Sequence, residues 1–90
     1  MDTLRINKIY SLYEILNDFN RLSVLISLHK NEREIDEIME ITGLSFTIVN
    51  HQLYYLIKKE VVSKNNNKYK ISNSTLKKIV TRMVEYVDIK

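Results

Sequence analysis

The residues best suited to chemistry lie in the middle of the chain, over about residues 46–59. If this stretch is helical, Thr47, Asn50, His51 and Tyr54 share the face opposite its apolar residues. Asparagine can form two hydrogen bonds with adenine, threonine can contact a base edge or a thymine methyl, and histidine can donate to a phosphate or a guanine acceptor. The tyrosine is better placed for phosphate or sugar. This set of side chains indicates contact with DNA bases.

Phe46, at the start of the same stretch, is open to two interpretations. Its ring can contact the methyl group of a thymine, or it can pack against other parts of the protein. With this residue included, the base-reading residues predicted from the sequence are Phe46, Thr47, Asn50 and His51.

A second group of residues is suited to holding the DNA backbone. Val61–Lys64 and Lys68–Ile71 read as two short strands, and Asn65–Asn67 between them suits a turn that needs a positive φ. We therefore expect a basic β-hairpin. The predicted backbone contacts are Ser45, Tyr54, Lys58, Lys64, Asn66, Lys68 and Lys70.

The single glycine marks the turn that must position the base-reading helix. Gly43 stands where one helical pattern stops, and glycine adopts the left-handed conformation without a Cβ penalty. Ser45 can then cap a helix over Phe46–Lys59. The expected inward residues of this helix are Val49, Leu53 and Leu56. A helix, a glycine turn and a second helix form the layout of a helix-turn-helix.

Four further helices are predicted from apolar spacing and capping residues. The first covers about Ile9–Leu16, with Ile9, Leu12, Tyr13 and Leu16 inward. The second runs from Asp18 as cap to about Lys30, with Leu22, Leu25, Ile26 and His29 on one face; we read His29 as a helix-end or packing residue. The third begins among acidic residues and turns Ile35, Ile38, Met39 and Thr42 inward. The last covers about Thr75–Val87 after a cap at Ser72, Asn73 or Ser74, with Leu76, Ile79, Val80, Met83 and Val87 inward.

Composition excludes several classes of protein. The chain of 90 residues has no Cys, Pro or Trp and one Gly, so residues 1–90 are expected to form one domain without disulfides or thiolate metal sites. It has no apolar run long enough to cross a membrane and no signal-peptide pattern, so we expect a cytoplasmic protein. Residues 1–45 carry five Lys/Arg against eight Asp/Glu, and residues 46–90 carry nine against three. This polarity suggests a polyanionic partner, either nucleic acid or an anionic membrane surface.

The order of helices, glycine turn and basic hairpin predicts a winged helix-turn-helix: mainly α, with about five helices and a two-stranded wing. Leu16–Leu28 and Thr42–Leu53 resemble the small dimeric ArsR/SmtB-type bacterial transcriptional repressors. The likeness spans about Ile9 to Val87, and Thr42–Ser45 with the following helix is its most specific part. It implies a homodimeric repressor on a pseudo-palindromic operator, joined through the first and last helices. The dimer residues that it implies are Leu12, Tyr13, Leu76, Ile79, Met83 and Tyr86.

The chain departs from that family in three places. Phe46 replaces a polar base reader, and Glu60 replaces a glycine commonly found before the wing. The third helix has no paired cysteines and the last helix has no histidine, so the metal-sensing sites of the family are missing. Glu34, Glu37 and Glu40 fit a solvated face better than a cation site. We therefore expect no metal and no cofactor.

Enzyme activity has no support in the sequence. The chain has no glycine-rich phosphate loop, and its two histidines stand in unrelated contexts. An alternative to DNA binding is a winged-helix module that binds another protein through the last helix or the acidic third helix. Random duplex DNA at low salt discriminates between the two, because an interaction module should not bind it.

Overall fold

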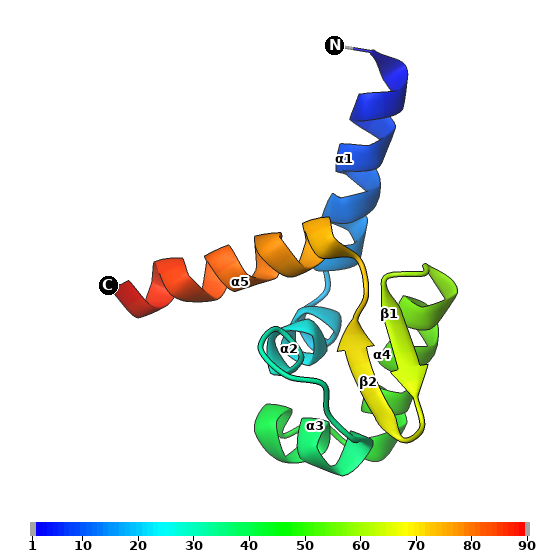
Figure 1. Ribbon diagram of the computed structural model, residues 1–90, viewed down its shortest axis with the longest axis vertical. Coiled ribbons are helices and arrows are strands. Elements are labelled where there is room, and N and C mark those ends of the chain that lie inside the picture. The colour runs from blue at the N-terminus through cyan, green and yellow to red at the C-terminus, as the bar shows by residue number, and fades with distance from the viewer. Residues whose placement is uncertain (1, 90) are drawn as a thin grey trace.

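The computed structural model describes residues 2–89 and contains five helices and one antiparallel hairpin in that range (Figure 1). The elements are α1 (Thr3–Leu16), α2 (Phe19–Ser27), α3 (Ile35–Thr42), α4 (Phe46–Lys58), β1 (Val62–Asn65), β2 (Lys68–Ile71) and α5 (Ser74–Ile89). This order confirms the predicted winged helix-turn-helix. The core lies where α2, α3, α4 and the hairpin meet, with the end of α1 and the start of α5 packed on it.

Side-chain caps start the helices close to where the sequence places them. Asp18 Oδ1 accepts a hydrogen bond from Arg21 N at 2.9 Å, and Asn73 Oδ1 accepts one from Leu76 N at 2.9 Å. The Asn73 bond selects one of the three candidate caps of the last helix. At α3, the Glu34 backbone N–H donates to Glu37 Oε1 at 2.9 Å. The acidic residues there thus satisfy a free backbone donor at the helix start.

The first helix is longer than predicted, and its inward face differs. Asp2 accepts a hydrogen bond from Arg5 N at 2.8 Å, so α1 begins at Thr3 rather than near Ile9. Only its C-terminal end packs on the core, mainly through the buried Ile15. Figure 1 shows α1 and α5 extending away from the compact body in different directions. Ile9 and Tyr13 are each more than half exposed, so they do not face inward as the spacing predicted.

The predicted core face of the second helix is also corrected. Val24, Leu25 and Leu28 are buried, whereas Ile26 lies at the surface. The helix ends at Ser27, three residues before the expected end at Lys30. Helix α2 packs against α3 and α4 and also against α5. Its buried surface is therefore wider than the single apolar stripe that the sequence predicted, and it lies on a different side of the helix.

One backbone contact joins the hairpin to the loop before α3. Arg33 N donates to Tyr69 O at 2.9 Å, and Tyr69 N donates to Arg33 O at 2.8 Å. The Arg33 guanidinium also donates from Nε to Ser27 O at 2.7 Å. No sequence pattern predicted this third extended segment, because it is a single residue long.

Left-handed backbone occurs at three described residues, each at a turn: Gly43 with φ 73°, Glu60 with φ 63° and Asn66 with φ 58°. Gly43 ends α3 as predicted, and Asn66 provides the expected positive φ in the hairpin turn. Glu60 ends α4 in a Schellman motif: its N–H donates to Ile57 O at 2.9 Å, and Val61 N donates to Leu56 O at 3.1 Å. Glu60 therefore adopts the conformation that a glycine would adopt without strain.

Replacing Glu60 by glycine should stabilise the domain. Glycine removes the strain of the left-handed conformation, but it also gives the unfolded chain more conformational freedom. The difference predicts a gain of about 0.5–1 kcal/mol in the free energy of unfolding. Urea denaturation at one fixed protein concentration measures it. Glu60→Ala is the matched control, because it removes the same side chain and keeps the strain. Equal gains for both variants would contradict the explanation.

Candidate nucleic-acid interface

The structure presents the polar face of α4 to solvent as predicted. Val49, Leu53 and Leu56 are almost completely buried on one side of the helix. Thr47, Asn50, His51 and Tyr54 are exposed on the other side. Gln52 is buried beside the apolar residues, and its Oε1 has no hydrogen-bond partner among the described residues.

A short, well-bonded turn sets the start of α4. Thr42 Oγ1 donates to Ile38 O at 2.7 Å and accepts from Leu44 N at 3.2 Å. Gly43 N donates to Met39 O at 2.8 Å, and Ser45 Oγ accepts from Ile48 N at 3.3 Å, which confirms Ser45 as the N-cap. The first turn of α4 is thus fixed to α3 while its outer side stays exposed.

Phe46 lies in that first turn, outside the core. Its side chain is 54% exposed, and it is absent from both the buried cluster and the half-buried residues packed against that cluster. Of the two interpretations left open by the sequence, the structure therefore disfavours packing.

The lysines of the hairpin lie on two different faces. Lys68 pairs with Asn65 and Lys70 with Ser63, on the face opposite the buried Val62, Tyr69 and Ile71. Lys64 pairs with Tyr69, and its Nζ lies 5.5 Å from the centroid of that ring. Because side chains alternate along a strand, Lys64 points to the other side from Lys68 and Lys70.

The surroundings of Lys64 differ accordingly. It lines a surface hollow together with Glu34, Asp36 and Asn67, at the start of α3. Asn66 stands at the exposed tip of the hairpin. At the other end of the basic surface, Lys58 Nζ lies 5.7 Å from the centroid of the exposed Tyr54 ring.

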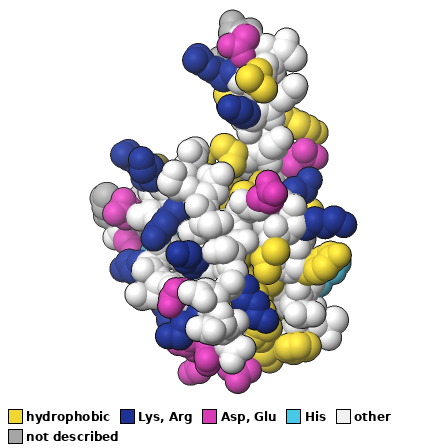
Figure 2. All heavy atoms as spheres, turned by 45° about the vertical axis from the view of Figure 1, so that its right-hand side comes forward, with side chains coloured by type: hydrophobic (Ala, Val, Ile, Leu, Met, Phe, Trp, Pro, Cys, Tyr) yellow, Lys and Arg dark blue, Asp and Glu magenta, His cyan; other side chains and the backbone are white. Residues whose placement is uncertain are grey.

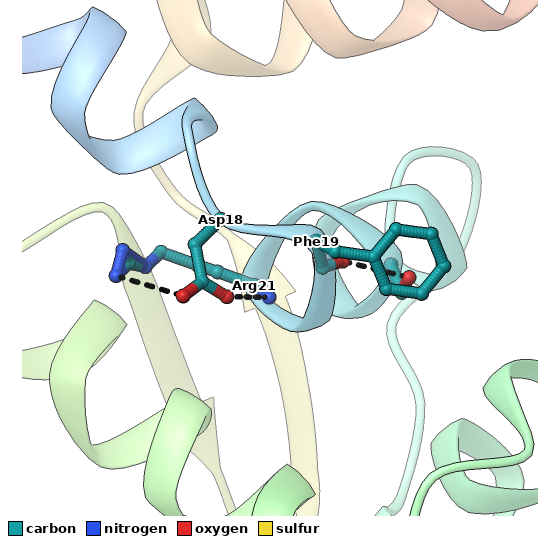
Figure 3. A network of polar contacts seen from close by, with 4 residues as sticks. Asp18, Phe19 and Arg21 are labelled. Atoms are coloured by element: carbon teal, nitrogen blue, oxygen red, sulfur yellow. Dashed lines mark hydrogen bonds and ion pairs between the residues drawn. The ribbon is translucent and has the colours of Figure 1, made fainter.

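An interaction that the sequence did not reveal supports α4 from behind. The Arg21 guanidinium lies 3.9 Å from the centroid of the Tyr55 ring, a cation–π contact between α2 and α4. Figure 3 shows the Asp18 carboxylate between the backbone amide and the guanidinium of Arg21, 4.0 Å from the latter, while the Phe19 ring points away. No spacing rule relates residues on two different helices, so only the fold shows this contact.

Charge is unevenly distributed over this region. The stretch from Ser45 to Ile71 carries five lysines and one glutamate, whereas α3 and the loop before it carry mainly acidic residues. In Figure 2, acidic side chains gather at the lower end, where α3 lies, whereas Lys and Arg side chains are scattered over the rest of the visible face. A polyanion is therefore favoured along α4 and the hairpin and disfavoured at α3.

The residues expected at a dimer interface are not all available to a partner. Tyr13, Met83 and Tyr86 are exposed, and Leu12 and Ile79 are half-buried. Leu76 is fully buried in the chain's own core, so its assignment to the dimer interface is wrong. The first turns of α5 pack against the core, and only its later turns extend beyond the body. The structure adds Ile6, Ile9 and Tyr10, which together with Tyr13 line a hollow on α1.

Other kinds of site are not found among the described residues. No group of three or more His, Asp or Glu side chains there is arranged to hold a metal ion. Glu34, Glu37 and Glu40 are exposed; Glu34 is the cap of α3, and the Glu37 carboxylate accepts a hydrogen bond from the Glu34 backbone N–H. Over residues 2–89, no helix has the length and apolar character needed to span a bilayer.

Comparisons with known proteins agree with this geometry. A family model described as the N-terminal domain of the methanogenesis regulatory protein FilR1 matches residues 15–87. A comparison with curated proteins finds no match.

Several solved structures share the fold. The predicted DNA-binding transcriptional regulator from E. coli is 18% identical with a TM-score of 0.83, covering 92% of this chain and 93% of that one. The transcriptional repressor BigR from Xylella fastidiosa is 20% identical with a TM-score of 0.81, covering 91% and 88%. The homodimeric winged helix-turn-helix DNA-binding domain Mb0332 from Mycobacterium bovis, a possible ArsR-family regulator, is 18% identical with a TM-score of 0.71, covering 94% and 82%. The resemblance to ArsR/SmtB-type regulators is thus confirmed at the level of the fold.

Proposed function

Since the chain belongs to the family of the N-terminal domain of the methanogenesis regulatory protein FilR1, we propose that it is a sequence-specific, double-stranded DNA-binding regulator of transcription. It acts as a homodimeric repressor in the cytoplasm by occupying a pseudo-palindromic operator, without enzymatic activity, metal or cofactor. The observation that carries this proposal is the outer face of α4, where hydrogen-bonding side chains are exposed and which is followed along the chain by lysines and a basic hairpin.

Each part of this surface has a role that follows from its chemistry. Thr47, Asn50 and His51 face the edges of the bases in the major groove, because their side chains donate and accept hydrogen bonds. Phe46 stands at the start of the same face. The phosphate contacts come from Ser45, Tyr54, Lys58, Lys64, Asn66, Lys68 and Lys70. Lys68 and Lys70 share the outer face of the hairpin and form its principal phosphate contacts.

The exposed apolar residues of α1 and α5 support the homodimer. Ile6, Ile9, Tyr10 and Tyr13 on α1 and Met83 and Tyr86 on α5 are exposed, and both helices extend away from the body (Figure 1). Exposed apolar residues that cluster in this way are typical of a protein–protein interface. A second copy placed there would hold two α4 helices about one DNA turn apart.

Selection of bound sequences from a random duplex library with the purified protein tests the proposal. A palindromic consensus is the expected result. A protein that retains no duplex at low salt would instead be an interaction module, and the DNA-binding proposal would be wrong.

Binding to the selected operator should depend steeply on salt. Neutralising about six phosphates predicts a slope near −5 in a plot of log K against log salt concentration. Fluorescence anisotropy titrations from low to physiological ionic strength measure this slope. An affinity that does not change with salt would exclude the phosphate contacts.

Two substitutions should separate base contacts from phosphate contacts. Lys68→Ala should weaken binding to all sequences about equally and make the slope shallower by about one unit, whereas Asn50→Ala should relax the preference at one position in each half-site. Competition titrations with operator and random duplexes measure both effects. Lys30→Ala is the control, because Lys30 is exposed outside the proposed surface. A loss of discrimination caused by Lys68→Ala alone would reverse the two assignments.

A charge on the exposed face of α1 should separate the dimer. Tyr13→Glu is expected to give a species of about 10.7 kDa, while the unchanged protein sediments at twice this mass at micromolar concentration. Sedimentation equilibrium distinguishes the two. Phe19→Glu, which alters an exposed aromatic residue on α2, should leave the dimer intact. A monomeric unchanged protein would refute the interface.

A further inference from the structure

Phe46 is an exposed apolar residue at the edge of the α4 face that carries the hydrogen-bonding side chains. It is the first residue of α4, immediately after the capping Ser45, and more than half of its surface is exposed. Thr47 follows it, and Asn50 lies one turn further along the same side of the helix. An apolar group of a bound partner that covered this ring would remove it from water and so add to the free energy of binding.

The place of Phe46 in the fold restricts what that partner can be. It lies at the α3–α4 turn, at the opposite end of the molecule from the projecting part of α1 (Figure 1). A second copy bound through α1 and α5 would therefore not cover the ring. The first turn of α4 is instead the part of the helix that would enter the major groove.

Within the major groove, the 5-methyl group of thymine is the apolar feature of the base edges. The other groups there are hydrogen-bond donors or acceptors, which a phenyl ring can only desolvate. A ring at the start of α4 therefore favours thymine over cytosine at the position that it covers. Asn50, one turn away, is suited to an adenine at a nearby position.

We propose that Phe46 is a specificity-determining residue that reads the 5-methyl group of one thymine in each half-site of the operator. This inference rests on the proposed function, since it requires a DNA duplex in contact with α4. It assigns the target to a chemical class: duplexes with a thymine at a fixed position in each half-site, recognised by a methyl group rather than by hydrogen bonds.

The chain provides a matched control for Phe46. Phe19 is also the first residue of a helix, also follows a side-chain cap, and is 81% exposed, but it lies on α2. Phe46→Ala and Phe19→Ala thus remove the same ring from equivalent helix positions. Only the first removes it from the proposed DNA surface.

The experiment replaces each thymine of the selected operator by deoxyuridine, one position at a time and symmetrically in both half-sites. Deoxyuridine pairs like thymidine and lacks only the methyl group. At one position the unchanged protein should lose about fourfold in affinity per methyl, or about fifteenfold for the two half-sites together. Anisotropy titration at fixed salt measures the ratio of dissociation constants.

Phe46→Ala should bind the thymine and deoxyuridine operators equally at that position, and Phe19→Ala should keep the full difference. The unchanged protein tests the methyl contact by itself, so the result does not depend on how well a variant folds. If the library yields no consensus, both the proposed function and this inference are wrong. If a consensus exists but no deoxyuridine weakens binding, or if Phe46→Ala keeps the difference, only the inference is overturned.

Discussion

Burial of one side of α4 is the constraint on which the rest of the structure depends. Val49, Leu53 and Leu56 have almost no exposed surface, and together they join α2, α3 and β1 into one core. A helix held on one side in this way has no freedom to rotate about its axis. Its opposite side is therefore presented in a fixed orientation, with Ser45 and the turn after Gly43 setting where it begins. The packing of the buried side of α4 therefore determines which residues the helix exposes.

The charge pattern acts on the same framework. The acidic start of α3 satisfies a free backbone N–H through Glu37 and interacts favourably with the positive end of that helix. It also places negative charge beside the hairpin, where Lys64 lies. A polyanion approaching the domain is attracted to the end of α4 and the outer face of the hairpin and repelled from α3. The charge distribution therefore orients an approaching polyanion as well as attracting it.

Local signals predicted the order of the elements well. Gly43, Ser45 and the asparagines of the hairpin determine backbone conformation within a few residues, so their roles are readable without the fold. The outward face of α4 follows from its apolar spacing for the same reason. The assignment of inward faces failed on α1, on α2 and on the later turns of α5, where Met83 and Val87 are exposed, because a buried face depends on which segments pack against the helix. Ile9 is more than half exposed, although its spacing predicts an inward position, whereas Leu76 is completely buried and so is not accessible to a partner. The contacts between Arg21 and Tyr55 and between Arg33 and Tyr69 join distant segments and have no sequence signature.

The pairing of Arg33 with Tyr69 also determines how the hairpin resists slippage. A shift of β2 by one residue would carry Tyr69 to the opposite face and break both of its bonds to Arg33. The same shift would bring Lys68 and Lys70 to the side that faces the core. A single residue in the loop before α3 thus discriminates between two alternative registers of the wing. It protects the outward placement of these lysines, although it belongs to neither strand.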